Sequence, residues 1–107
     1  SDAVDADTRF RIGSVTKMLT AAAVMQQVDA GTVFLDDRIT KFIPEVDFLG
    51  HWPAEVMTVE HLLTHATGIP DLNFYPDDDV GPNALTEWAE SLYGIGLHAP
   101  PGAFWNY

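Results

Sequence analysis

The apolar pattern of residues 15–30 is the feature that most constrains the fold of this chain. Apolar side chains recur there at the three- and four-residue spacing of a helix, and three consecutive alanines would let another helix approach closely. Gly31 follows at the position where glycine commonly ends a helix. The sequence therefore predicts a largely buried helix over residues 15–30. Polar and apolar residues alternate at 9–12, which predicts a short strand before it.

The rest of the chain reads as short helices separated by turns and loops. Helices are predicted at residues 38–42, 60–65 and 84–93, and Thr58 is placed to cap the second of them. A turn is predicted at 34–37, irregular chain at 47–57 and a long acidic loop at 71–83. Leu85, Trp88, Ala89 and Leu92 share one face of the last helix, so Trp88, like Trp105, is expected in the core.

Ser14 and Lys17 form the pattern Ser-x-x-Lys at the start of the first helix. Residues three apart on a helix share a face, with Cβ atoms about 5–6 Å apart. A serine hydroxyl is a weak nucleophile until a neighbouring base takes its proton, and a lysine can be that base where the site is dry enough to favour the neutral amine. The first helical turn, with its unpaired N–H groups and positive dipole end, also favours developing negative charge. By itself the pattern is weak, because a capping serine followed by a surface lysine is its usual origin.

Three blocks in order give the pattern a context. Residues 10–21 read FRIGSVTKMLTA, residues 58–71 read TVEHLLTHATGIPD and residues 101–107 read PGAFWNY. The first closely resembles the nucleophile segment of the beta-lactamase-related serine hydrolases, which include class C beta-lactamases, D-Ala-D-Ala peptidases and carboxylesterases. The second resembles that family's LLTHTSGL segment, and the third the approach to its Tyr-x-Asn motif. The order and approximate spacing of the three make the resemblance far more specific than any one block.

The resemblance implies roles for three residues. Ser14 corresponds to the acylated nucleophile, Lys17 to its activating partner, and Tyr107 to the tyrosine that shares or takes over the role of base. The backbone N–H of Ser14 corresponds to one of two oxyanion donors. Asn106 precedes the tyrosine, so the asparagine of Tyr-x-Asn is not in this sequence, and neither is the family's third motif.

The resemblance also implies an α+β fold. The chain is expected to be a mostly helical fragment of the beta-lactamase/transpeptidase-like fold, with most of the antiparallel sheet missing. Residues 1–107 would form a partial domain that holds the end of one strand, the nucleophile helix and part of the helical lobe. Without the second oxyanion donor, this chain alone is expected to be inactive and loosely packed.

Composition narrows the possible partners. The formal net charge of −11 makes nucleic-acid binding by a basic face improbable, and no apolar run approaches the about 18 residues of a membrane span. With no cysteine, thiol chemistry is excluded. His61 and His65 are spaced as in H-E-x-x-H, but residue 62 is leucine, so no metal is expected and packing beneath the 68–70 turn is favoured. The acidic run 77–79 lacks the order of an EF-hand, so it predicts a solvated loop. No cofactor is expected.

The predicted function is therefore a serine hydrolase that works through an acyl-enzyme on a small-molecule amide, beta-lactam or ester carbonyl. A non-catalytic penicillin-binding-like sensor of the same fold, and an acidic helical interaction module with chance motifs, are the alternatives. The family resemblance places Asn73, Phe74 and Tyr75 beside the substrate cleft, where they would shape specificity. It also favours an extracytoplasmic location, whereas the sequence itself gives no location and no acyl group.

Overall fold

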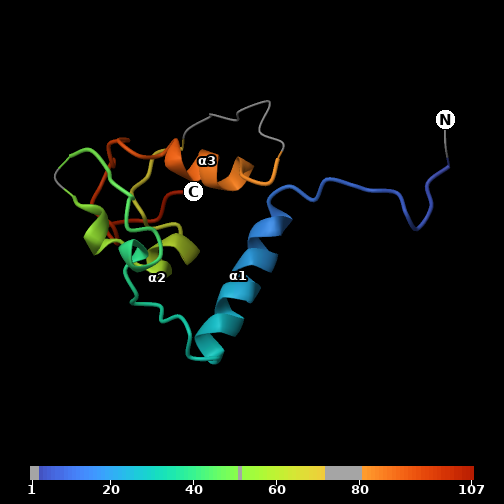
Figure 1. Ribbon diagram of the computed structural model, residues 1–107, viewed down its shortest axis with the longest axis horizontal. Coiled ribbons are helices and arrows are strands. Elements are labelled where there is room, and N and C mark those ends of the chain that lie inside the picture. The colour runs from blue at the N-terminus through green and yellow to red at the C-terminus, as the bar shows by residue number, and fades with distance from the viewer. Residues whose placement is uncertain (1–2, 51, 72–80) are drawn as a thin grey trace. The chain divides into compact units, whose positions relative to one another are not determined.

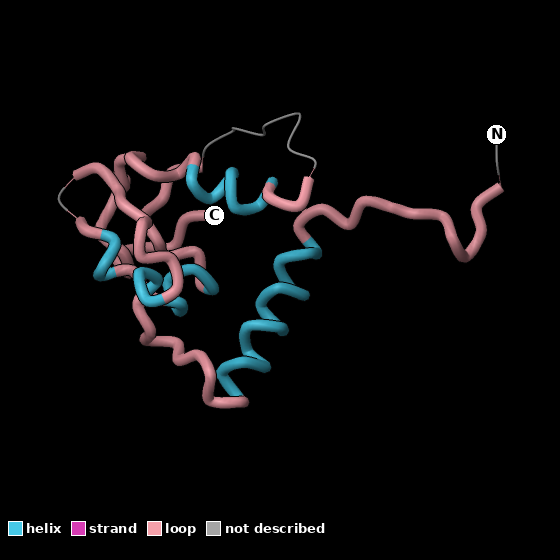
Figure 2. The backbone as a smooth tube through the Cα atoms, viewed as in Figure 1, coloured by secondary structure: helices cyan, strands magenta, loops and turns pink. Residues whose placement is uncertain are grey.

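The computed structural model describes residues 3–50, 52–71 and 81–107, and it divides the chain into two compact units, Ser1–Val33 and Phe34–Tyr107. Every regular element in the described residues is a helix, and more of them lie in turns and irregular chain than in helices (Figures 1 and 2). The described residues hold no β-strand, only the isolated bridges Arg38–Thr58 and Leu49–Gly96.

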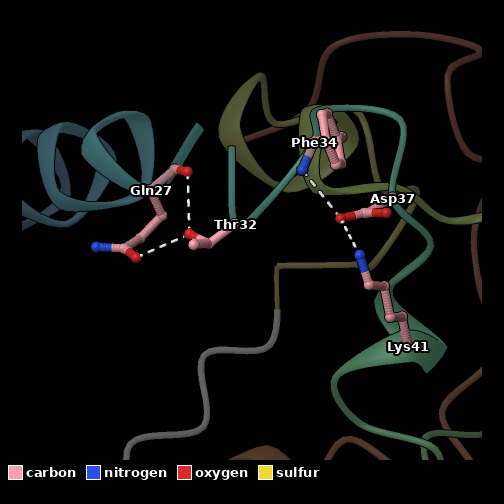
Figure 3. Close-up of polar contacts among 5 residues, drawn as sticks. All are labelled: Gln27, Thr32, Phe34, Asp37 and Lys41. Carbon is pink, nitrogen blue, oxygen red and sulfur yellow. Dashed lines mark hydrogen bonds and ion pairs between the residues drawn. The ribbon is translucent and has the colours of Figure 1, made fainter. Parts of the chain in front are cut away.

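Helix α1 (Val15–Asp29) is the only regular element described in the first unit, and its bounds match the prediction within one residue. It ends in a Schellman motif, in which Gly31 N–H donates to the Val28 carbonyl and Thr32 N–H to the Gln27 carbonyl, both at 3.0 Å. The Thr32 hydroxyl also lies 3.1 Å from the Gln27 carbonyl oxygen and 3.0 Å from Gln27 Oε1 (Figure 3). The single hydroxyl proton of Thr32 is shared between these two acceptors, and both contacts hold the Thr32 side chain at the end of α1.

Two expectations for this unit are wrong. The alternating residues 9–12 form no strand, because a strand needs a partner and neither of the two bridges involves them. Helix α1 contains no buried residue, and Met18, for example, is 73% exposed. The other described residues of the unit, 3–14 and 30–33, are irregular chain too short to cover a helix of four turns.

The second unit is built on short helices. These are the 3₁₀ helices η1 (Ile39–Lys41) and η2 (Ala54–Val56), and the α-helices α2 (Val59–Leu63) and α3 (Ala84–Glu90). The predicted turn at 34–37 is present, with Asp37 N–H donating to the Phe34 carbonyl at 3.0 Å. The helices at 38–42, 60–65 and 84–93 are confirmed in place, each shorter than expected.

The core of this unit lies between loops and the short helices. Met57 is fully buried, and the cluster around it consists of Ile39, Phe48, Ala54 and Leu97. Backbone bonds close the cluster: Ile39 N–H donates to the Met57 carbonyl and Leu49 N–H to the Ile95 carbonyl, both at 3.0 Å. The irregular segment expected at 47–57 therefore supplies three of the five cluster residues, and its lack of periodicity gave no sign of this.

The amphipathic face predicted for the last helix does not enter this core. Helix α3 contains no buried residue, and Trp88 is 42% exposed. Trp105, also expected in the core, is 66% exposed. Apolar side chains at helical spacing mark a face that a partner can cover, but they do not show that the partner lies within the same unit.

Candidate active site

Ser14 is the N-cap residue of α1, directly after a tight turn. Val15 N–H donates to the Ile12 carbonyl at 3.2 Å, and Thr16 and Lys17 N–H donate to the next two carbonyls, those of Gly13 and Ser14, at 3.0 and 3.1 Å. The first-turn N–H groups, expected to be unpaired, are therefore satisfied by the turn itself. The Ser14 side chain makes no capping hydrogen bond, unlike that of a typical N-cap serine.

Lys17 lies one turn along the same helix and reaches back to the serine. Its Nζ donates a hydrogen bond to Ser14 Oγ at 3.3 Å. Both side chains are exposed, so the pair is accessible to a reacting molecule. The geometry joins a hydroxyl and an amine through one hydrogen bond with the amine as donor, and activation of the serine would need the reverse bond, to a neutral amine.

The second and third sequence blocks meet in the unit Phe34–Tyr107. His98 N–H donates to the Gly68 carbonyl at 2.8 Å and Gly102 N–H to the Ala66 carbonyl at 2.7 Å. Asn106 N–H donates to the His65 carbonyl at 2.8 Å. These three backbone bonds run between segments some thirty to forty residues apart in sequence, and they fix the chain that leads to Tyr107.

The Tyr107 ring lies against His65. The two ring centroids are 4.9 Å apart with the planes tilted by 38°, while the Trp105 ring meets His65 edge-on at 6.2 Å. Tyr107 is 52% exposed, so packing on the histidine covers only part of the residue. Tyr107 therefore packs against a residue whose own backbone is hydrogen-bonded within the second unit.

His61 has a structural task in the same region. Its N–H donates to Thr58 Oγ1 at 3.4 Å, and its Nδ1 accepts from Thr58 N–H at 3.2 Å, which forms a capping box with histidine in place of the usual glutamate. The predicted Thr58 cap is thus confirmed. Among the described residues no three histidine, cysteine, aspartate or glutamate side chains come together in a way that could hold a metal ion.

The predicted site residues fall into three groups. Ser14 and Lys17 lie together in the unit Ser1–Val33, and Tyr107 belongs to the unit Phe34–Tyr107. The expected specificity residues Asn73, Phe74 and Tyr75 lie outside the described residues. The contact of His65 with Tyr107 was not predicted from the sequence, because the spacing of His61 and His65 resembles that of a metal motif instead. One signal of this contact was present in the sequence: His65 and Tyr107 lie in two blocks that resemble the same family.

Comparisons with known proteins give the site its context. The sequence model of the family described as Beta-lactamase matches residues 1–107. Penicillin-binding protein 4 of Amycolatopsis lactamdurans is 34% identical over 105 residues, which cover 98% of this chain and 27% of that protein. Esterase EstB of Burkholderia gladioli is 41% identical over 114 residues, covering 94% of this chain and 29% of the esterase.

The fold is also found in solved structures. The D-stereospecific amidohydrolase from Streptomyces sp. matches with a TM-score of 0.72 and 30% identity, over 96% of this chain and 34% of that one. The chain thus spans between a quarter and about a third of the length of these relatives. No described helix has the length and apolar character needed to cross a bilayer. The chain belongs to the Beta-lactamase family, within the beta-lactamase-related serine hydrolases.

Proposed function

We propose that the protein to which this chain belongs is a serine hydrolase that forms an acyl-enzyme on Ser14. One observation carries the proposal, the 3.3 Å hydrogen bond between Lys17 Nζ and Ser14 Oγ at the start of α1. When the amine is neutral, the same two atoms form the reverse hydrogen bond, and the hydroxyl proton points at the lysine nitrogen. The pair can then release a serine oxygen for attack on a carbonyl.

In the proposed reaction, Ser14 forms the bond to the substrate and Lys17 carries the proton. Ser14 Oγ bonds to the carbonyl carbon as its proton passes to Lys17 Nζ, and the carbonyl oxygen takes the negative charge. The positive end of the α1 dipole favours that charge. Collapse of the intermediate breaks the bond to the leaving group, which takes the proton from Lys17 Nζ, and leaves an ester on Ser14. Water then hydrolyses the ester, and Tyr107 shares the work of proton transfer.

Relatives indicate the substrate class. By name, they include a penicillin-binding protein, an esterase and a D-stereospecific amidohydrolase. All of these names are compatible with acyl transfer from a small molecule to serine. We therefore propose an ester, an amide or a beta-lactam as the substrate, with Asn73, Phe74 and Tyr75 as specificity residues.

The test is covalent labelling of the full-length protein with a fluorophosphonate and with a fluorescent penicillin, followed by peptide mass spectrometry. We expect the adduct on Ser14 and its loss in Ser14→Ala. Ser91→Ala is the matched control, because Ser91 is exposed and its hydroxyl donates to the Trp88 carbonyl at 2.6 Å. An adduct on another residue, or labelling that survives Ser14→Ala, overturns the assignment.

The two lysines of the chain provide a second matched pair. Lys17→Arg should abolish labelling, because arginine keeps the charge but does not give up its proton. Lys41→Arg should label normally, because Lys41 pairs with Asp37 instead.

Hydrolysis of a p-nitrophenyl ester, a D-amino-acid amide and penicillin then separates an enzyme from a sensor. A sensor is acylated on Ser14 but does not turn over.

A further inference from the structure

His65 combines two contacts with the segment that carries Tyr107. Its carbonyl accepts the Asn106 N–H at 2.8 Å, and its ring lies 4.9 Å from the Tyr107 ring. The Trp105 ring meets the same imidazole at 77°, with centroids 6.2 Å apart. Both separations fall in the range in which aromatic rings attract one another. A single residue therefore holds the tyrosine segment through its backbone and through its side chain.

The backbone of His65 is itself unusual. With φ at 55° it is the one non-glycine residue of the described chain in the left-handed region, where an ordinary side chain is disfavoured. Its neighbours fix that conformation: Thr64 N–H donates to the Glu60 carbonyl and Ala66 N–H to the His61 carbonyl, both at 2.9 Å. These bonds belong to the turn that ends α2, where the C′ residue commonly adopts positive φ, so the helix end fixes the conformation of His65.

We infer that His65 is a positioning residue for Tyr107 in the reaction proposed above, on which this inference rests. A tyrosine side chain has two torsions, and proton transfer needs its oxygen within hydrogen-bond reach of the reacting group. Packing against the imidazole restricts those torsions. His65 acts through the tyrosine and takes no proton from the substrate.

The experiment compares His65→Asn, His65→Phe and wild type in the full-length protein, with hydrolysis of a p-nitrophenyl ester as the readout. Asparagine tolerates positive φ but removes the ring, whereas phenylalanine keeps a ring. We expect His65→Asn to lower kcat about tenfold or more with KM within about twofold, because small misplacements of a reacting group are costly. His65→Phe should recover most of kcat while it lowers stability, because phenylalanine is disfavoured at positive φ. His98→Asn is the control, since that side chain is exposed and its backbone bond survives the change.

A double-mutant cycle with Tyr107→Phe separates positioning from a general structural effect. In the Tyr107→Phe background, His65→Asn should lower kcat no further, because the oxygen to be positioned is gone. An equal fold-loss in both backgrounds, or an unchanged kcat in His65→Asn alone, overturns the inference. If the asparagine variant does not fold, His65→Gly, which suits positive φ, replaces it in the cycle.

The result also distinguishes this inference from the proposed function. Acylation of Ser14 in wild type with no coupling between positions 65 and 107 overturns only the role of His65. Absence of acylation on Ser14 in wild type overturns both.

Discussion

Replacing Gly68 with alanine tests the close approach that joins the segments of the second and third sequence blocks. A Cβ at Gly68 would overlap the Ala99 carbonyl oxygen and lie 3.1 Å from the Ala99 carbonyl carbon, inside contact distance. The backbone there has φ of 77°, which disfavours any side chain. The atom it meets belongs to the backbone, so a rotamer change cannot relieve the overlap. The segment that carries Ala99 must move instead.

The expected loss has two parts. Placing alanine at positive φ costs about 1–2 kcal/mol. Displacing Ala99 also disrupts the adjoining 2.8 Å hydrogen bond from His98 N–H to the Gly68 carbonyl, a net loss of about 0.5–1.5 kcal/mol. Residual crowding adds to this. We therefore expect Gly68→Ala to lower the free energy of unfolding by about 2–4 kcal/mol.

Gly94→Ala is a closely matched control. Gly94 has the same φ of 77°, but a Cβ there meets nothing within 4 Å, so it reports the backbone cost alone. Urea unfolding of the full-length variants, followed by circular dichroism, gives both losses. Equal losses at the two positions would refute the reasoning, because the Ala99 backbone would then give way without cost and the close approach would not fix the two segments.

Two further predictions concern local interactions of the second unit. Thr58→Ala should lower the free energy of unfolding by about 1 kcal/mol. Thr58→Ser should lower it by much less, because serine keeps the oxygen that accepts the His61 N–H. Urea unfolding measures both losses, and equal losses would contradict the capping role. Asp37 accepts from Lys41 Nζ at 2.6 Å and from Phe34 N–H at 2.9 Å (Figure 3), and these bonds, the lysine first, hold its pKa below the ordinary 3.8. Carbon-detected NMR titration should show this low pKa rising part of the way back in Lys41→Met, and an unchanged midpoint would contradict the assignment. Because the folded pKa is lowered, the pair stabilises the fold fully above the ordinary value, and this contribution is lost as the pH falls through the folded pKa.

Features that depend on neighbouring residues were predictable from the sequence. Helix α1 begins and ends where Ser14 and Gly31 predict, and Thr58 caps α2. The Ser14–Lys17 contact follows from helical spacing in the same way. Each of these is decided within a few residues by backbone geometry and by the reach of one side chain.

Features that depend on distant residues were not. Met57 is the fully buried centre of the core, yet it lies in a segment without periodicity. The bonds from His65, Ala66 and Gly68 to the chain before Tyr107 join irregular segments through backbone groups that every residue carries, so no side-chain pattern announces them. The predicted burial of α1 and of the apolar face of α3 was wrong. An apolar face indicates that something can cover it, but it does not indicate which segment does. The role of Tyr107 came from resemblance alone and stays a prediction.

The backbone bond between Gly68 and His98 has a consequence for how such a protein can change over time. It joins two residues that are thirty positions apart, and within the enclosed segment Ile95 and Leu97 are tied to the core by the Leu49–Ile95 bond and by burial. Doubling the length of a closed flexible loop costs only about 0.6 kcal/mol, so changes of length in this segment that spare α3 and the core contacts at 94–97 are inexpensive. Evolution can therefore lengthen or shorten the segment before α3 while the register of Tyr107 on His65 is preserved.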